Sequence, residues 1–387
     1  MSLDLLAVST QARAMSGALH DELRSLPQRV EQARALLAAA AEKWRFWHDL
    51  IEEQSQAIAW LTAQPLEPLT ATYDLPPCPA AYACAAVDGS HLDVDRHGIV
   101  ACWLINIGTA LVRYGPDAAY QASSRPWLGY RDEELYLRDA ASGREYAIEG
   151  PLLAAQRDVE EGRALAALAG ALPTDRPRLA LQDGTLIRWT LAAQDEVVRN
   201  YFLQRYLDAL TTLQTQQCPV AGYLSRPRAR EVVGLVRLLL ARSDERDGQR
   251  GRRDDPLRGL TDALLFEHLD EGQRSARWVS TSRINSQLYG PHRIQFFYLR
   301  VGRELARIEY PAWVAELGAI DTVHALVYDQ CQRGRGYPNL LARAHEQAVI
   351  HSAERRRFET LIEQHLARAE LPARRSAKAS AKLYPGA

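Results

Sequence analysis

The stretch of this sequence that says most about its fold is Tyr82-Ala-Cys-Ala-Ala-Val-Asp-Gly-Ser90. Its first six residues form an apolar run of the length of a buried strand, and the run ends at an acid followed by glycine and a hydroxyl. The pattern recurs later, where the apolar run Arg178-Leu-Ala-Leu-Gln182 ends at Asp183-Gly184-Thr185. We therefore predict two strands of one sheet, each with a carboxylate at its end.

Asp88 and Asp183 are the first candidates for chemistry. A carboxylate at a strand end is held by a rigid element and points into the crevice beyond the sheet. The glycine allows close approach of a backbone or a phosphate, and the hydroxyl can donate to a carboxylate or a phosphate. Mg²⁺ and Mn²⁺ prefer oxygen ligands, so two such carboxylates on adjacent strands are suited to bind them. Asp-Gly is also a frequent turn sequence, and that simpler interpretation stays open.

A third acid is expected from the helix between these strands, which we predict over residues 151–172 with Pro151 in its first turn. Leucines recur there at three- and four-residue steps, and Glu161 shares their face. An acid beside an apolar face is costly unless it is paired or bound to a metal, and Arg157 one turn earlier is a possible partner. Glu160 is the alternative acid, on a face with alanines.

Near the C-terminus, the sequence Gly-Tyr-Pro-Asn-Leu-Leu-Ala-Arg-Ala-His-Glu over residues 336–346 predicts a helix that begins at Pro338. Tyr337 and His345 then share one face, about 12 Å apart along the axis. A histidine on such a face is often structural. Beside a metal-bound phosphate, an imidazole can instead be a metal ligand, a proton shuttle or a phosphate contact.

The remaining pattern predicts a mixed α/β domain rather than repeated βαβ units. Residues 1–65 are expected to be helical, with Pro27 dividing them into two helices, and a proline-rich linker follows. We expect the main domain over residues 80–370, with a mobile charged insertion at 242–258 and a basic, disordered tail at 371–387. The exposed-looking arginines 188, 226, 228 and 283 are candidate phosphate contacts.

Composition limits the possible classes of protein. The chain has 387 residues, 47% of them hydrophobic and 25% charged, which is typical of a folded globular protein. The net charge of −1 excludes a uniformly basic nucleic-acid coat, so any DNA-binding surface must be local. Five scattered cysteines without a CxxC motif argue against a zinc site or a disulfide framework. No signal peptide or long apolar run is present, so we expect a cytoplasmic protein.

Taken in order, these motifs resemble the NurA family of nucleases, from about residue 30 to 368. No single motif is specific, but their order and spacing together are. Besides the acidic helix around Glu161, the matching pieces are Ala86-Val-Asp-Gly-Ser90, Leu181-Gln-Asp-Gly-Thr-Leu186, Val220-Ala-Gly-Tyr223, Thr261-Asp-Ala-Leu-Leu-Phe266 with Glu271-Gly-Gln-Arg-Ser275, Arg307-Ile-Glu-Tyr-Pro311, and Gly336-Tyr-Pro-Asn-Leu-Leu-Ala-Arg-Ala-His345.

The resemblance implies an RNase H-like mixed sheet core with flanking helices and a toroidal homodimer. It implies a Mn²⁺-dependent 5′→3′ exonuclease on DNA, with Mg²⁺ as a possible substitute, that also cuts single strands internally. It further implies a HerA-like hexameric ATPase as partner in DNA end processing. Carried over, Asp88, Glu161 and Asp183 match the metal-binding acids, and Tyr337 and His345 match the pair of the final motif, with His345 also a candidate metal ligand.

The chain departs from the family pattern at two places. Gln182-Asp-Gly-Thr185 stands where the family more often has Leu-Asp-Gly-Ser, and the insertion at 242–258 has no counterpart. Two alternatives stay open. One is a non-catalytic RNase H-like scaffold for the ATPase, and the other is an RNase H-like nuclease with another substrate.

Overall fold

The computed structural model describes residues 4–55, 57–94, 100–247 and 255–370. Contacts divide the chain into two compact units. The first unit contains Met1–Leu75, Leu224–Ser286 and Arg293–Ile308, and the second contains Pro76–Tyr223, Gln287–His292 and Glu309–Ala387. These boundaries differ from the expected ones, because the N-terminal helical segment groups with residues from the middle of the chain.

The second unit is built on a mixed sheet with the strand order β9-β8-β3-β4-β5. Strands β3, β4 and β5 form an antiparallel meander, and β8 and β9 run parallel to β3. This is the strand arrangement of the RNase H-like fold, so the predicted fold class is confirmed. The strands are β3 (Tyr82–Leu92), β4 (Trp103–Tyr114), β5 (Ala119–Gly129), β8 (Arg178–Asp183) and β9 (Val220–Leu224).

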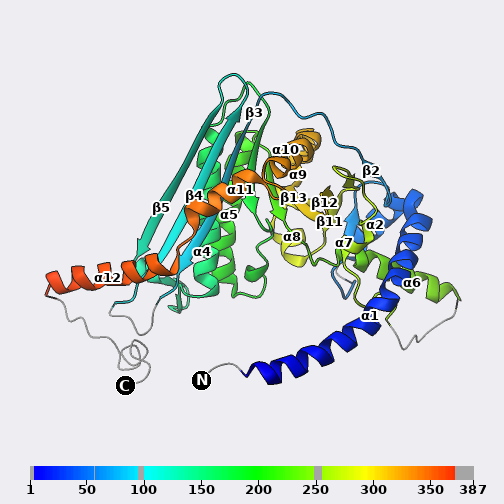
Figure 1. Ribbon diagram of the computed structural model, residues 1–387, viewed down its shortest axis with the longest axis horizontal. Helices are drawn as coiled ribbons and strands as arrows, with labels where there is room; N and C mark the ends of the chain where they lie inside the picture. The colour runs from blue at the N-terminus through cyan, green and yellow to red at the C-terminus, as the bar shows by residue number, and fades with distance from the viewer. Residues whose placement is uncertain (1–3, 56, 95–99, 248–254, 371–387) are drawn as a thin grey trace. The chain divides into compact units, whose positions relative to one another are not determined.

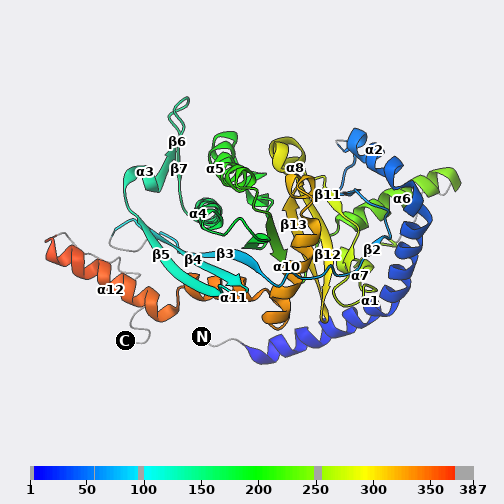
Figure 2. The ribbon, with the colours of Figure 1, turned by 90° about the horizontal axis from the view of Figure 1, so that it is seen from above.

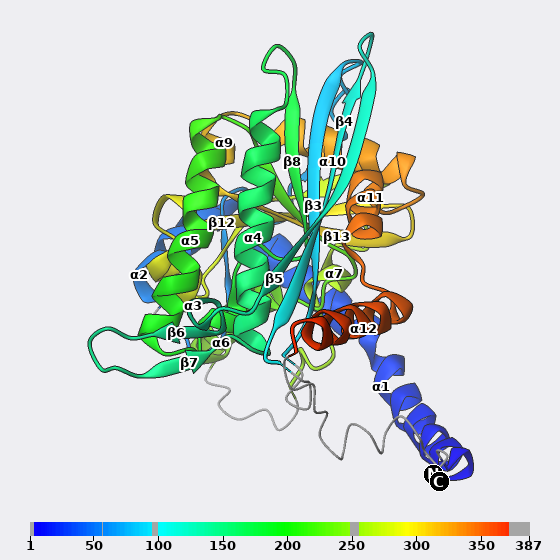
Figure 3. The ribbon, with the colours of Figure 1, turned by 90° about the vertical axis from the view of Figure 1, so that its left-hand side faces the viewer.

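Helices cover both faces of this sheet. Helices α4 (Pro151–Gly170) and α5 (Glu196–Thr215) lie together on one face, and α11 (Asn339–Ala348) crosses β3 and β4 on the other, as Figures 1 and 2 show. Figure 3 shows α4 and α5 running side by side beside β8 and β3. The two helices approach closely at Gly162, where an added Cβ would lie 3.3 Å from side-chain atoms of Tyr206 and Ala209.

The other elements of the second unit surround this core. Two short strands form a separate two-stranded sheet, β6 with β7. The elements are α3 (Asp132–Leu135), β6 (Tyr136–Arg138), β7 (Glu145–Ala147), the 3-10 turns η2 (Trp189–Leu191) and η3 (Gly290–His292), α9 (Ala312–Glu316), α10 (Ile320–Arg333) and α12 (Ser352–Arg368).

The first unit packs helices against strands β1, β11, β12 and β13, with β10 and β2 at the side. Its elements are α1 (Leu5–Ala40), η1 (Ala41–Lys43), α2 (Trp44–Gln54), β1 (Ala63–Pro65), β2 (Thr72–Tyr73), α6 (Glu231–Asp247), α7 (Asp262–Leu265), β10 (Arg274–Ser275), β11 (Trp278–Ser280), α8 (Arg283–Leu288), β12 (Ile294–Val301) and β13 (Glu304–Pro311). The last residues of α8 and of β13 belong to the second unit.

The prediction that Pro27 divides the N-terminal segment is wrong. Helix α1 continues through Pro27, and the break comes at the short 3-10 turn η1. Proline removes one backbone hydrogen bond within a helix, which leaves a carbonyl without its donor. The carbonyl that loses its donor is that of Leu23, which is exposed, so water can solvate it.

The predicted proline-rich linker is partly ordered strand. Strand β1 pairs with β11, and the buried Glu67 pairs with Arg274 and Arg277. The charged insertion is also more ordered than expected, because α6 extends to Asp247 and Leu257 is buried. Residues 248–254 of the insertion and the tail from 371 lie outside the described residues.

Candidate functional site

The two Asp-Gly motifs lie side by side on neighbouring strands. Strands β3 and β8 are parallel, and Val87 pairs with Gln182. Asp88 and Asp183 are therefore the next residues along each strand. Hydrogen-bonded strands are about 4.8 Å apart, so the two carboxylates belong to one locality of the sheet. This is the convergence that the sequence pattern predicted.

The two motifs differ in local structure, contrary to the expectation that both end a strand. Asp88 lies inside β3, where it pairs with Gly108 of β4, and the strand continues to Leu92. The first Asp-Gly pair is therefore not a turn. Asp183 is the last residue of β8, and Gly184 has a φ of +78°, a backbone conformation that favours glycine.

Asp88, Gly89 and Ser90 alternate between the two faces of the sheet, as successive strand residues must. Asp88 faces α11, where His345 Nδ1 lies 2.6 Å from Asp88 Oδ2. Gly89 faces α4, and a Cβ added there would lie 2.4 Å from Glu161 Oε1. The Ser90 hydroxyl donates to the carbonyl of Ala348 at the end of α11.

Helix α11 is held against the sheet by backbone contacts and by two anchoring side chains. A Cβ at Gly108 would lie 2.2 Å from the carbonyl oxygen of Ala344, so only glycine admits the helix at this distance. The Asn106 amide joins Ser90 in binding the carbonyl of Ala348, at 2.9 Å. These contacts fix the helix that carries His345, whose side chain remains 64% exposed.

Asp183 is held from the same side as Asp88. The Tyr337 hydroxyl donates to its carboxylate, and the Tyr337 ring packs edge-on against Tyr223 at 5.4 Å between centroids. Partial burial raises the pKa of Asp183, and the negative charge of Asp88 adds to the rise, whereas the Tyr337 hydrogen bond opposes it. Burial and the nearby Asp183 charge raise the pKa of Tyr337, so its hydroxyl stays protonated as a donor.

The structure distinguishes the two glutamates of α4 by their surroundings. Glu161 is buried, accepts a hydrogen bond from Gln182 at 3.2 Å and forms an ion pair with Arg157 at 3.1 Å. Glu160 instead bonds Arg163 and Gln156. Glu161 is therefore the one whose carboxylate reaches the Asp88-Gly89 backbone.

Burial raises the pKa of Glu161 to about 7, and the charge of Asp158 adds to the rise while Arg157 and Arg188 oppose it. The charge of Asp88 contributes to the rise of the Glu161 pKa, as it does to that of Asp183. Mutual repulsion among carboxylates is what a divalent cation relieves.

The donor set of the site fits Mg²⁺ or Mn²⁺ in its chemistry, since it offers carboxylate oxygens and one imidazole. Within the described part of the chain, however, no three acidic, histidine or cysteine side chains are grouped so that they could hold a metal ion as they stand. Each acid is held by a protein group: Asp88 by His345, Asp183 by Tyr337 and Glu161 by Arg157.

The structure gives two arginines near the site a shared partner, Asp158, that the sequence did not identify. Arg188 is buried, where it pairs with Asp158 at 2.9 Å and lies over the Tyr206 ring, so its prediction as a phosphate contact is wrong. Arg157 bridges Asp158 and Glu161. A separation of thirty residues hides the pairing of Arg188 with Asp158, and no local pattern reports it. The other candidate arginines 226, 228 and 283 are exposed residues of the first unit.

The geometry can be set beside known proteins. The family model described as the NurA domain matches residues 83–350, which include every candidate residue of the site. The chain belongs to the NurA family. This membership supports a nuclease-type function. No curated protein is matched by the chain.

The NurA-family chain is also similar to two solved structures. One is Drosophila Piwi, with 10% identity and a TM-score of 0.29 over 71% of this chain and 30% of that one. The other is LC9-RNase H1, a type 1 RNase H with the type 2 active-site motif, with 12% identity and a TM-score of 0.23 over 44% of this chain and 75% of that one. The chain thus spans only 30% of the Piwi chain.

Among the described residues, no helix has the length and apolar character needed to cross a bilayer.

Proposed function

We propose that this NurA-family protein is a divalent-metal-dependent DNA nuclease. It degrades DNA from 5′ ends, cuts single strands internally, and processes DNA ends together with a HerA-like hexameric translocase. We further propose that it works as a homodimer with Mn²⁺, or with Mg²⁺ in its place. The site supports the metal-dependent chemistry, and the family resemblance supplies the polarity, the dimer and the ATPase partner.

The observation that carries the proposal is the adjacency of Asp88 and Asp183 on neighbouring parallel strands, with Glu161 and His345 beside them. The charge of Asp88 raises the pKa of both Glu161 and Asp183, an arrangement poorly suited to stability alone. The carboxylates are well arranged to bind a cation, whose positive charge would balance theirs.

Asp88, Asp183, Glu161 and His345 would hold the metal, which supplies an activated water and neutralises charge on the phosphate. The protein's own groups do the rest. Asp88 orients the His345 ring through Nδ1, so Nε2 serves one of two roles, as a ligand of the metal or as the nitrogen that exchanges a proton with the leaving oxygen. The Tyr337 hydroxyl holds Asp183, and its ring offers a surface for a base or a sugar of the bound strand.

The test is digestion of end-labelled linear and single-stranded DNA with Mn²⁺, Mg²⁺ or EDTA. The two neighbouring glutamates of α4 provide a matched pair of variants. Glu161→Gln should abolish most cleavage, whereas Glu160→Gln should cut like the wild type, because Glu160 bonds Arg163 away from the site. Equal activity in both variants would remove Glu161 from the site.

The same assay separates the alternatives. Absence of cleavage with either metal would favour a non-catalytic scaffold, and preferential cleavage of RNA would favour a nuclease with another substrate. Light scattering on the purified chain tests the homodimer, and co-purification with a hexameric ATPase encoded nearby tests the partner. A monomer that binds no ATPase would contradict both parts of the assembly.

A further inference from the structure

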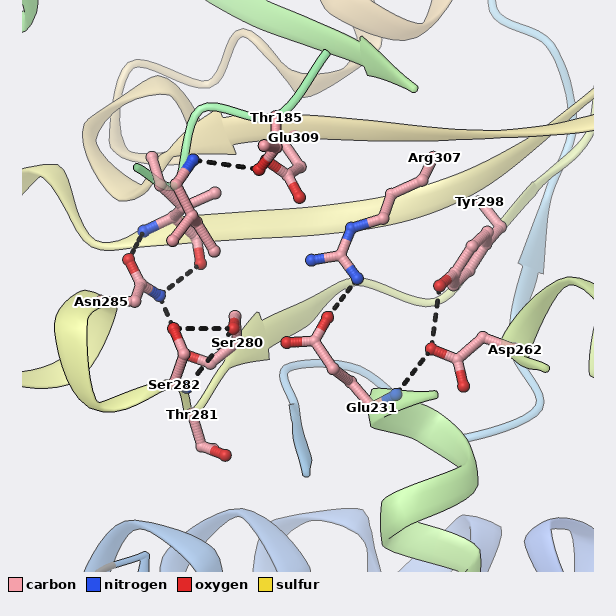
Figure 4. Close-up of polar contacts among 12 residues, drawn as sticks. Thr185, Glu231, Asp262, Ser280, Thr281, Ser282, Asn285, Tyr298, Arg307 and Glu309 are labelled. Atoms are coloured by element: carbon pink, nitrogen blue, oxygen red, sulfur yellow. Dashed lines mark hydrogen bonds and ion pairs between the residues drawn. The ribbon is translucent and has the colours of Figure 1, made fainter. Parts of the chain in front are cut away.

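The loop that follows Asp183 is held by a buried carboxylate from a distant strand. Glu309 of β13 is 1% exposed, and its Oε2 accepts hydrogen bonds from the Thr185 hydroxyl and the Leu186 amide, both at 2.8 Å. Figure 4 shows Thr185 and Glu309 facing each other across this contact. All three residues belong to the second unit.

Thr185 is fully engaged by this loop. Besides donating to Glu309, its Oγ1 accepts from the Ile187 amide at 3.1 Å and lies 3.3 Å from the Trp189 indole nitrogen. A hydroxyl has one donor and two acceptor positions, so these contacts use all of them. The Thr185 hydroxyl is therefore not available to a phosphate, and its role must lie in the loop itself.

The loop is held from other directions too. The Gly184 amide donates to the Tyr223 carbonyl at 2.9 Å. The Tyr289 hydroxyl donates to the Leu186 carbonyl at 2.8 Å and accepts from the Arg188 amide at 2.7 Å. The amides of Gly184, Leu186, Ile187 and Arg188 are thus all hydrogen-bonded. The residue immediately before this fixed loop is Asp183.

We propose that Glu309 is a positioning residue of the nuclease site. Through Thr185 and the Leu186 amide, it fixes the loop after β8 and so sets where the Asp183 carboxylate stands beside Asp88. The inference rests on the proposed function, because it assigns Glu309 to the binding of the metal that Asp183 would hold. Groups that orient a metal ligand from behind typically change metal affinity about 10- to 100-fold when removed.

A comparison within the molecule shows why Glu309 is not simply another structural acid. Glu231 in the first unit is buried to the same degree, but its carboxylate pairs with the guanidinium of Arg307 (Figure 4). That pair lies in a buried network of the first unit that also contains Asp262 and Tyr298. Glu309 instead binds the hydroxyl and the amide of the loop that carries Asp183.

The test compares variants that remove the contact with variants that keep it. Thr185→Val removes the hydroxyl at nearly constant shape, and Glu309→Leu removes the acceptor. Thr185→Ser keeps the hydroxyl, and Glu309→Gln keeps an acceptor oxygen. Glu231→Gln is the control for loss of a buried acid as such. Calorimetric titration of each full-length protein with Mn²⁺ alone gives the metal affinity without any cleavage.

We expect Thr185→Val and Glu309→Leu to weaken Mn²⁺ binding about tenfold or more, and the two conservative variants to restore it to within about threefold of wild type. Glu231→Gln should lower the unfolding temperature and leave Mn²⁺ affinity unchanged. Wild-type affinity in Thr185→Val overturns the proposal, and so does equal weakening in Glu231→Gln. Thr185→Val keeps the test decisive if Glu309→Leu fails to fold.

The outcomes separate this inference from the proposed function. If the wild type binds Mn²⁺ but cuts no DNA, the nuclease proposal fails and the Mn²⁺ titrations still decide the role of Glu309. If the wild type cuts DNA and Thr185→Val binds Mn²⁺ normally, only the positioning role fails. If the wild type takes up no Mn²⁺, the positioning role is overturned as well.

Discussion

The carboxylates near the strands have different surroundings in the two units. In the first unit, Glu231 pairs with Arg307, and Asp262 accepts the Glu231 and Val233 amides at the start of α6 and the Tyr298 hydroxyl. In the second unit, Asp88 and Asp183 lie next to each other on adjacent strands, and the negative charge of Asp88 raises the pKa of Asp183.

The difference lies in how the charge is balanced. Burial raises the pKa of both Glu231 and Asp262, and fixed donors oppose the rise in each case. At the second-unit site the donors are uncharged or exposed: the Tyr337 phenol and the Gly184 amide on Asp183, and the Gly89 amide and the largely exposed His345 imidazole on Asp88. An acid set apart from other site acids and bound by fixed donors helps to hold the fold together, whereas acids on adjacent strands leave charge for a ligand to neutralise.

The largest expected effect tests the two acids on adjacent strands of the second unit. Asp88→Asn or Asp183→Asn should reduce Mn²⁺-dependent cleavage about 100-fold or more, because metal ions contribute several kcal/mol to transition-state stabilisation. The unfolding midpoint should be unchanged or higher, since each change removes a repulsion. Cleavage of end-labelled DNA and urea denaturation measure the two effects. Retained cleavage in either variant contradicts the site.

The next effect tests the structural acids. Arg307→Ala leaves Glu231 buried without its guanidinium and removes the contact of that guanidinium with the Phe296 ring, 3.6 Å away. Breaking a buried pair from one side costs about 3–5 kcal/mol of folding free energy. Urea denaturation measures the loss, and protein that remains folded should cut DNA at the wild-type rate. A cost below about 1 kcal/mol would show that this buried ion pair contributes no more to stability than an exposed one.

A third prediction concerns pH. The folded-state pKa of Glu161 is raised from 4.5 to about 7, so the native state keeps a proton that the unfolded chain loses. This contribution is fully present below pH 4.5 and is lost as pH rises through about 7. In EDTA, the wild type should lose about 3 kcal/mol of stability over that window relative to Glu161→Gln. Parallel pH profiles of the two proteins would contradict the raised pKa.

The smallest expected effect tests how closely the position of the Glu161 carboxylate matters. Gly89→Ala places a methyl group where Glu161 Oε1 would be 2.4 Å away, so the Glu161 side chain must move. We expect about a tenfold loss of cleavage rate from misplacing the carboxylate and about 1 kcal/mol of lost stability. Gly17→Ala is the control, because a Cβ there meets nothing within 4 Å. An unchanged rate in Gly89→Ala would show that the position of Glu161 does not matter.

The sequence predicted those elements whose pattern is local. The apolar runs before Asp88 and Asp183 are strands, and the leucine spacing put Glu161 on the core side of its helix, where it is buried. Strand β5 was missed because exposed polar residues in its middle, Gln121 and Ser123 to Arg125, leave no apolar run to mark it. The extension of β3 through Gly89 was missed because glycine and serine usually mark turns, and pairing with β4 overrides that preference.

The supports of the site could not be predicted for a different reason. Glu309 and Thr185 are 124 residues apart, and His345 and Asp88 are 257 apart. Such contacts depend on how distant segments of the chain pack against the sheet. No local repeat or motif in the sequence reports that packing. The motif residues were therefore recognisable, while the groups that hold them were visible only in three dimensions.

The alternation of Asp88, Gly89 and Ser90 across the sheet has a consequence for how this region can change. Deleting one residue between Tyr82 and Val87 would turn the acid toward α4, where Glu161 is already buried, and would present glycine to His345. Length changes upstream in β3 should therefore be far less tolerated than substitutions among its apolar residues.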